Sequence, residues 1–156
     1  MPFLLRLWRK FPLWVHILAS RIVRSKFRVA VAAMIFDEQG RVLLFKHTYR
    51  KFEWGIPGGT LEYGEQPDKA MVREFLEETG MQIQVQELLL ADSSKLDHHV
   101  SLIYLCKIVA GEFKPTLEIA EIKYFDPNDL PPMLFAEKDL IKQVAREMRV
   151  SKNELA

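Results

Sequence analysis

The stretch that decides the fold spans residues 59–81 and reads GTLEYGEQPDKAMVREFLEETGM. Its second half is expected to form a helix, on which Glu74, Glu77 and Glu78 stand at positions i, i+3 and i+4. Residues at these spacings share one helix face, so the pattern predicts three mutually repelling carboxylates that converge on one point. A cation is expected there, and oxygen ligands in this number suit a hard divalent ion such as Mg²⁺ or Mn²⁺. The pattern indicates metal-assisted chemistry on a phosphate ester or anhydride.

The alternative interpretation is a solvated acidic helix face, because charged runs usually face water. The residues around the glutamates argue against it. Gly59 is followed after five residues by Glu65, and after seven more by REFLEETGM, which begins at Arg73. This spacing, G-x5-E-x7-R-E-U-x-E-E-x-G-U with U a bulky apolar residue, resembles the signature of the Nudix hydrolases, MutT-like enzymes that cut nucleoside diphosphates linked to another group. The flanking segments WGIPGG (54–59) and EIAEIKYFDPNDLP (118–131) are similar to the family as well.

The resemblance implies a role for each polar position of the motif. The three glutamates would hold the ion together with the backbone carbonyl of Gly58, and would take part in catalysis. Arg73 would assist them by pairing with a glutamate of the motif and lowering its proton affinity. The remaining positions would be structural: Glu65, which braces the loop against the helix, Gly59, which lets the backbone approach a ligand, and Gly80, a left-handed helix cap.

Hydrolysis also needs a carboxylate that accepts the proton of the attacking water, and the family does not place this base consistently. Outside the motif, Glu118 and Glu121 are the candidates, because they lie in the segment that supplies the base in some members. We prefer Glu121, with Glu118 as a residue near the substrate, and the alternative for both is an exposed strand edge. His98 and His99 are candidate contacts to a phosphate or a base. Neighbouring residues of a strand point to opposite faces, so at most one of these histidines is expected to reach the site.

Length and composition indicate a single enzyme domain. The chain has 156 residues, of which 49% are hydrophobic and 28% charged, and one cysteine, Cys106. A lone cysteine in an apolar run favours a buried thiol and no internal disulfide, so a cytoplasmic location is expected. Before Asp37 there are seven basic residues and no acidic one, whereas the rest of the chain is net acidic. Residues 1–26 are therefore interpreted as a basic leader, residues 27–150 as the Nudix domain and residues 151–156 as a frayed tail.

Periodicity predicts an α/β fold, a three-layer α/β/α sandwich with a mixed sheet, which the resemblance also implies. The leader has apolar residues at helical spacing and is expected to be an amphipathic helical segment. Strands are expected at 28–36, 42–46, 83–91, 100–109 and 119–125, a hairpin-like turn at 37–40, and helices from about 67 to 79 and from about 136 to 148. Trp54 is expected in the core and His47 on the surface.

Three functions of different classes are compatible with parts of the sequence. The intact motif favours a metal-dependent pyrophosphohydrolase over a non-catalytic nucleotide sensor, and over a membrane-surface protein, which the leader alone would suggest. The substrate is expected to be a small nucleotide. Nucleotide sugars, nucleoside triphosphates and RNA 5′ ends all stay open. For the leader we prefer packing within the protein or across a homodimer to binding of an anionic membrane surface.

Overall fold

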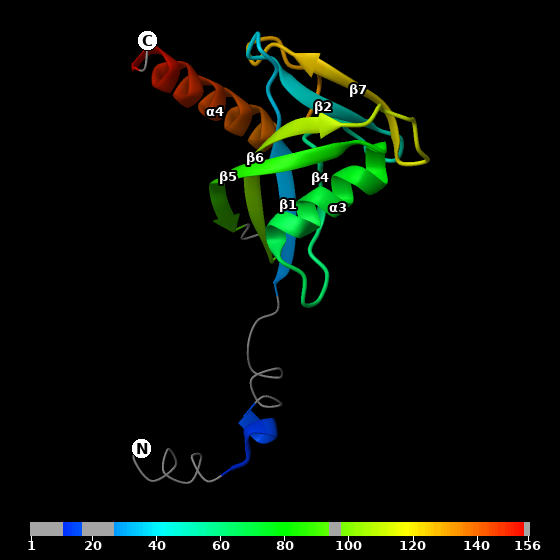
Figure 1. The fold of residues 1–156 in the computed structure, drawn as a ribbon, viewed down its shortest axis with the longest axis vertical. Coiled ribbons are helices and arrows are strands. Elements are labelled where there is room, and N and C mark those ends of the chain that lie inside the picture. Colours follow the sequence, from blue (N-terminus) through cyan, green and yellow to red (C-terminus); the bar gives the residue numbers. More distant parts are fainter. Residues whose placement is uncertain (1–10, 17–26, 94–97, 155–156) are drawn as a thin grey trace.

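The computed structural model describes residues 11–16, 27–93 and 98–154, with side chains as far as residue 148. Figure 1 shows the elements of the domain. They follow in the order β1 (Arg28–Met34), β2 (Val42–His47), β3 (Trp54–Gly55), β4 (Gly58–Thr60), α3 (Pro67–Thr79), β5 (Gln82–Ser93), β6 (His99–Ala110), β7 (Ile119–Phe125) and α4 (Phe135–Glu154). Within this described part of the chain, none of the helices has the length and apolar character needed to cross a membrane.

The strands form two sheets. The first has the order β4-β1-β6-β5 and is mixed, because β1 runs parallel to β6 and the other pairs are antiparallel. The second, β3-β2-β7, is antiparallel. The chain passes from one sheet to the other at the expected turn, where the Asp37 carboxylate accepts hydrogen bonds from the backbone N–H groups of Gln39 (3.1 Å) and Arg41 (2.8 Å). The mixed sheet and the hairpin-like turn are as predicted. Phe36 and Val42 form an antiparallel bridge across the turn, beyond which β1 and β2 belong to different sheets.

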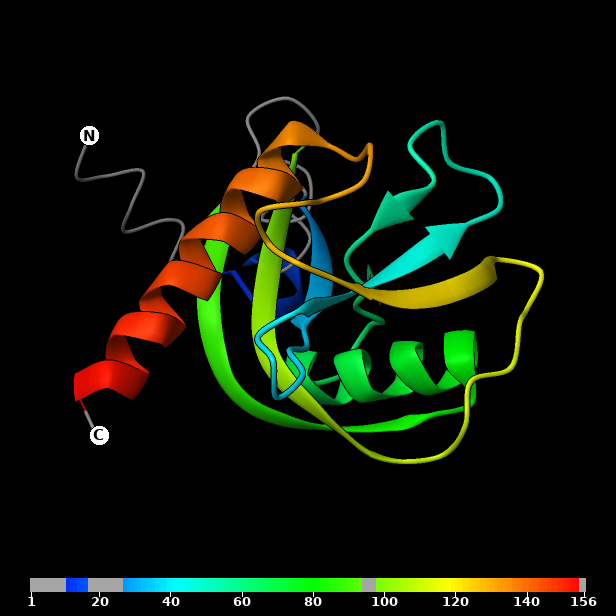
Figure 2. The same cartoon turned by 90° about the horizontal axis from the view of Figure 1, so that it is seen from above.

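Helices cover both faces of the strands, which gives three layers (Figure 2). Successive strand residues point to opposite faces, so β1 and β2 each contribute to two separate cores. On one face the buried cluster contains Val31, Ala33, Leu43 and Phe45 with Met71 and Phe75 of α3. On the other it contains Met34, Val42 and Leu44 with Ile141 and Val144 of α4. The predicted α/β sandwich is confirmed, and its two cores hold α3 and α4 at fixed positions against the sheets.

Local signals set the two ends of α3. Pro67 is the first helical residue, where its missing N–H leaves no bond unmade, and Gly80 ends the helix in the left-handed conformation with φ 73°. The Gly80 N–H donates to the carbonyl of Leu76 at 2.8 Å. Thr79 is fully buried, and its hydroxyl accepts a hydrogen bond from the N–H of Met81 at 3.0 Å. The last turn of α3 is thereby joined to the start of β5, which fixes where the glutamates of the helix lie.

Three expectations from the sequence need correction or lie outside the described residues. His47 is buried, with 1% of its surface exposed, because it ends β2 opposite Ile119 of β7. Helix α4 continues to Glu154, beyond its expected end at residue 148. Most of the leader lies outside the described residues. In its described part, residues 11–16, Trp14 is 66% exposed and the segment lies apart from the sheets in Figure 1.

The packing of α3 predicts a large difference between two neighbouring helix positions. Phe75 is fully buried and its ring lies 5.4 Å from that of Phe45, whereas Leu76 is 42% exposed. Phe75→Ala should lower the free energy of unfolding by about 3–5 kcal/mol, because it leaves a cavity between α3 and the sheet. Leu76→Ala, the matched control, should cost less than about 1 kcal/mol. Urea denaturation measures both, and equal losses would contradict this packing.

Candidate active site

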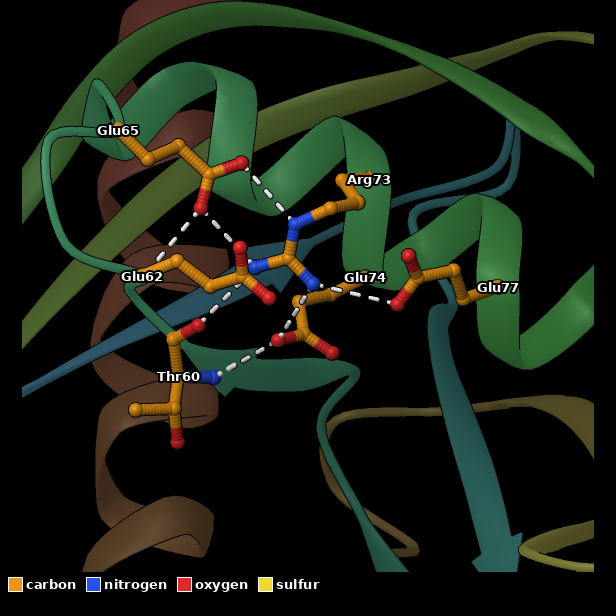
Figure 3. Close-up of polar contacts among 6 residues, drawn as sticks. All are labelled: Thr60, Glu62, Glu65, Arg73, Glu74 and Glu77. Atoms are coloured by element: carbon orange, nitrogen blue, oxygen red, sulfur yellow. Dashed lines mark hydrogen bonds and ion pairs between the residues drawn. The ribbon is translucent and has the colours of Figure 1, made fainter.

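The Arg73 guanidinium is the centre of a network that joins α3 to the loop before it (Figure 3). Its Nε and Nη2 donate to the two carboxylate oxygens of Glu65, each at 3.0 Å. Nη2 also donates to the backbone carbonyl of Thr60 at 3.1 Å. Nη1 lies 3.1 Å from Glu74 Oε1 and 3.2 Å from Glu77 Oε2. One cation therefore contacts three carboxylates and the end of β4.

These contacts shift proton affinities in the directions that electrostatics requires. Hydrogen bonds from Arg73 lower the pKa of Glu65, and those to Glu65 and Glu74 raise the pKa of Arg73 well above its usual value. A second hydrogen bond stabilises the loop itself: the Glu62 N–H donates to the Glu65 carboxylate at 3.3 Å. Glu65 thus connects the loop to the helix, as expected from the sequence. Arg73 was expected to pair with one glutamate of the motif, and it contacts three.

Two glycines bring the backbone of β4 close to its neighbours. A Cβ on Gly59 would collide with the carboxylate of Glu74, so only glycine leaves room for that side chain. A Cβ on Gly58 would lie 2.6 Å from the carbonyl oxygen of Val31 on the adjacent strand. Beside them, the Thr60 N–H donates to Glu74 Oε1 at 3.1 Å. Glu74 is consequently held from two sides, by the backbone of β4 and by Arg73.

Glu78, one turn after Glu74, has a different environment. Its Oε2 atom is buried and has no hydrogen-bond partner among the described residues. Burial raises the pKa of Glu78 to about 7, the negative charges of Glu74 and Glu118 add to the effect, and Arg50 opposes it. A cation close to Glu78 would stabilise its ionised carboxylate. It would offset both causes of the raised pKa, the burial and the neighbouring negative charges. The Glu78 position therefore suits a cation ligand.

The three glutamates of α3 do not converge on one point as the sequence predicted. Among the described residues, no three carboxylate, histidine or cysteine side chains lie close enough together to hold an ion. Glu77 does not line the cleft; its side chain is 59% exposed and contacts Arg73. Glu74 and Glu78 line a common cleft of about 940 Å³, which Gly58 and Gly59 also border. The carboxylates of Glu74 and Glu78 offer oxygen ligands, which fit Mg²⁺ or Mn²⁺ better than a softer metal.

Outside the motif, the cleft contains one glutamate and one histidine of the two candidate pairs, Glu118/Glu121 and His98/His99. Glu118 lines the cleft and Glu121 does not. Glu121 lies in β7 opposite Lys46 of β2, and Glu118 directly precedes β7. The preference for Glu121 is therefore not supported by its position. His99 lines the cleft, whereas His98 does not. His98 instead has a positive φ of 50° and an edge contact with Phe27, whose ring centre lies 6.1 Å away.

The charged residues of the cleft that sequence reasoning missed include Arg50 and Glu137. Arg50 lies in the connection between β2 and β3, and Glu137 in the first turn of α4. Burial raises the pKa of Glu137, while Arg50 and the N–H of Ile56 act against this. Neither residue belongs to a motif, and their proximity depends on how α4 packs against the sheets. The local signal for Glu137 was its place near the start of a helix that follows the prolines at 131 and 132, and this signal indicates a helix end but not a site.

Comparisons with known proteins agree with this geometry. Residues 26–146 match the profile of the NUDIX domain. An ADP-ribose pyrophosphatase of Methanocaldococcus jannaschii is 32% identical over 118 residues, which cover 72% of this chain and 70% of the relative. The crystal structure of a MutT NUDIX hydrolase from Burkholderia pseudomallei superposes with a TM-score of 0.66 at 29% identity, covering 77% of this chain and 99% of that one. A UDP-X diphosphatase shares the fold, with a TM-score of 0.71 at 23% identity over 86% of this chain and 70% of the other.

The fold and the cleft define an α/β protein with a mixed sheet and an acidic helix, α3, beside a polar cleft. The chain belongs to the Nudix hydrolase family. It is a pyrophosphohydrolase, an enzyme that acts on phosphoric anhydrides.

The environment of Glu78 predicts how the stability of the metal-free protein depends on pH. Folding raises the pKa of Glu78 from its ordinary 4.5 to about 7, so the folded state binds the proton more tightly than the unfolded state. The stability that this difference in pKa contributes is therefore fully present below the unfolded-state pKa of 4.5, and it is lost as pH rises through the folded-state pKa of about 7. In EDTA, Glu78→Gln should have a higher melting temperature than the wild type, by a margin that grows up to about pH 7 and is constant above it.

The control for this experiment is Glu87→Gln, a substitution at an exposed position of β5. Its melting temperature should differ from the wild type by the same small amount at every pH. A Glu78→Gln margin that does not change with pH would show that the carboxyl is not destabilised by burial.

Proposed function

We propose that the chain hydrolyses a diphosphate linkage in a nucleoside diphosphate derivative, with Mg²⁺ or Mn²⁺ as cofactor. The observation that carries this proposal is the buried Oε2 of Glu78, which has no hydrogen-bond partner in the described part of the chain and shares one cleft with Glu74 and Glu118. Glu74 and Glu78 would hold the ion with the backbone of Gly58, and Glu77 would stay with Arg73. When bound, the ion would offset the charge of the diphosphate and lower the pKa of the attacking water.

The protein's own groups account for the remaining requirements. Arg73 and the Thr60 N–H hold Glu74 in one orientation, so a ligand atom is fixed before substrate arrives. Water attacks one phosphorus, the bond from that phosphorus to the bridging oxygen breaks, and the bridging oxygen leaves with the other phosphoryl group. Glu118 accepts the proton of the water, because it lines the cleft outside the helix that would hold the ion. The products are a nucleoside monophosphate and a second phosphorylated fragment.

The substrate class follows from the size and lining of the cleft. A volume of about 940 Å³ is large enough for a nucleotide, and the lining includes the small or apolar residues Ala30, Ala32 and Ile103. A flat base or a sugar can pack against such residues. Because similar proteins are named as an ADP-ribose pyrophosphatase and a UDP-X diphosphatase, ADP-ribose and UDP-linked sugars are the first compounds to test. Nucleoside triphosphates and RNA 5′ ends complete the panel.

The experiment compares Glu118→Gln with Glu121→Gln on the substrate that the panel identifies, with Mg²⁺, with Mn²⁺ and with EDTA. EDTA should abolish turnover. Glu118→Gln should lower turnover about 100-fold or more with little change in metal affinity, because a proton acceptor is lost and no ligand is. Glu121→Gln, outside the cleft, should remain near the wild type. Reaction in ¹⁸O-labelled water, followed by mass spectrometry of the products, identifies the phosphorus attacked.

Two results would contradict the proposal. Turnover undiminished by Glu118→Gln would place the proton acceptor elsewhere, and Glu78 would then be the first alternative. A free nucleoside as the first product would mean that a phosphate ester bond, and not the diphosphate linkage, is cut.

A further inference from the structure

Two rows of paired residues run across the four-stranded sheet along one side of the cleft. Strand pairing places Thr60, Ala30, Ser101 and Asp92 in the first row, and Gly58, Ala32, Ile103 and Leu90 in the second. In both rows the order of the strands is β4, β1, β6 and β5. All eight residues line the cleft. Paired residues of neighbouring strands share a face of the sheet, so the two rows form one continuous surface, the sheet platform.

The sheet platform is apolar in its middle and polar at one end. Its β1 positions are alanines, and the second row continues with Ile103 and Leu90. The first row ends in the hydroxyl of Ser101 and the carboxylate of Asp92, which are direct partners on β6 and β5. The Cβ atoms of such partners lie about 5 Å apart, so both groups can contact one ligand. Neither side chain forms a hydrogen bond or an ion pair with another residue in the described part of the chain.

The other end of the platform lies beside the carboxylates of α3. Glu74 accepts a hydrogen bond at 3.1 Å from the N–H of Thr60, the β4 end of the first row. Three strand spacings of about 4.8 Å separate β4 from β5, so Asp92 lies about 14 Å farther along the row. A nucleotide extends over a similar length from its phosphate to the far edge of its base. A diphosphate held at Glu74 and Glu78 would therefore carry its ribose over the alanines of β1 and its base over the apolar residues of β6 and β5.

The polar end of the platform restricts which bases fit. An ionised carboxylate only accepts hydrogen bonds, whereas a serine hydroxyl can also donate one. Adenine and cytosine present an amino group beside a ring nitrogen that accepts, which matches a carboxylate next to a hydroxyl. Hypoxanthine and uracil present a carbonyl oxygen beside a ring N–H, which is the reverse order. In the same position, their carbonyl oxygen would face Asp92, and the two acceptors would repel each other.

We propose that the sheet platform binds the nucleobase of the substrate, and that Asp92 and Ser101 select adenine or cytosine over hypoxanthine or uracil. Asp92 accepts a hydrogen bond from the amino group, and Ser101 donates one to the adjacent ring nitrogen. Ile103 and Leu90 contact the face of the base. This inference rests on the proposed function for the position of the diphosphate. The amino-bearing edge comes from a purine or from a pyrimidine, and the experiment distinguishes these two sources.

The first test measures binding without catalysis. The backbone amides of Asp92 and Ser101 are followed by NMR while stable reaction products are added with Mg²⁺: AMP, IMP, CMP and UMP, with ribose 5-phosphate as the reference. A Kd about tenfold lower for AMP than for IMP assigns adenine, and the same margin of CMP over UMP assigns cytosine. Ribose 5-phosphate should leave both amides unshifted. Equal affinities within both pairs, or no shift with any nucleotide, would overturn the platform as a base site.

Variants then test the polar end of the platform. Asp92→Asn replaces a carboxylate by an amide, which both donates and accepts and so tolerates either kind of base. It should reduce the tenfold margin to about twofold or less, and Ser101→Ala should reduce it to about fourfold. Asp139→Asn is the matched control, because Asp139 lines the same cleft from α4, outside the platform. It should keep the wild-type margin, and an equal loss in both aspartate variants would contradict a direct contact to Asp92.

Tyr49 offers a competing place for the base. Its 63% exposed side chain also lines the cleft, outside the platform. Tyr49→Leu should keep the margin between the members of each pair, because the contact that selects the base lies at Asp92. A margin lost in Tyr49→Leu and kept in Asp92→Asn would place the base on Tyr49 and overturn the platform.

Kinetics provide the second readout. Replacing adenine by hypoxanthine, or cytosine by uracil, in the substrate should lower kcat/KM about tenfold in the wild type and about twofold or less in Asp92→Asn. A wild type that prefers the hypoxanthine or uracil member would overturn the base selection. A wild type without turnover on any compound of the panel would instead contradict the proposed function, and the NMR titration would still decide on the platform.

Discussion

The contact on which the site depends is the four-way attachment of the Arg73 guanidinium. Arg73 contacts Glu65, Glu74 and Glu77 together with the carbonyl of Thr60. Without a cation at this point, carboxylates from the loop and from α3 would repel one another at the place where the loop must lie against the helix. A single planar fork provides both the charge and the directions of the bonds, which a point charge could not. The acidic helix can therefore fold as part of a packed domain.

Compensation of charge also divides the acidic residues by role. Glu65 and Glu77 both form ion pairs with Arg73, and we propose that they serve the scaffold. Glu74 is held by Arg73 and the backbone of β4, so its position is determined by groups that do not react. Glu78 and Glu137 each keep one buried oxygen that has no hydrogen-bond partner among the residues that the structure describes. The unfavourable burial of these two is offset by the cores on either side of the sheets, and the cleft keeps the carboxylates that chemistry and recognition would use.

Features that depend on neighbouring residues could be predicted from the sequence, and features that depend on contacts between distant segments could not. The ends of α3 were predictable because Pro67 and Gly80 act within one helical turn, and the buried Cys106 because strand alternation is local. The fold class followed from the motif. The pairing of strands into two sheets was not predictable, because residues 37–40 form the same turn in either case. Strand alternation separates Glu118 from Glu121, but which of the two lines the cleft depends on contacts between distant segments. The meeting of His47, Arg50 and Glu137 depends on such contacts as well, and they leave no pattern in neighbouring residues.

The most direct measurement is amide hydrogen exchange at Thr60 and Glu62 in Arg73→Lys, combined with its turnover. Lysine keeps the charge and loses the fork. The Thr60 and Glu62 amides, which donate to Glu74 and Glu65, should exchange about tenfold faster or more, and turnover should fall roughly 10- to 100-fold. Arg41→Lys, at an exposed pair with Asp37, is the control and should change neither. Lost turnover with unchanged exchange at both amides would contradict the account, because Arg73 would then act on the substrate and not as the clamp that positions the site.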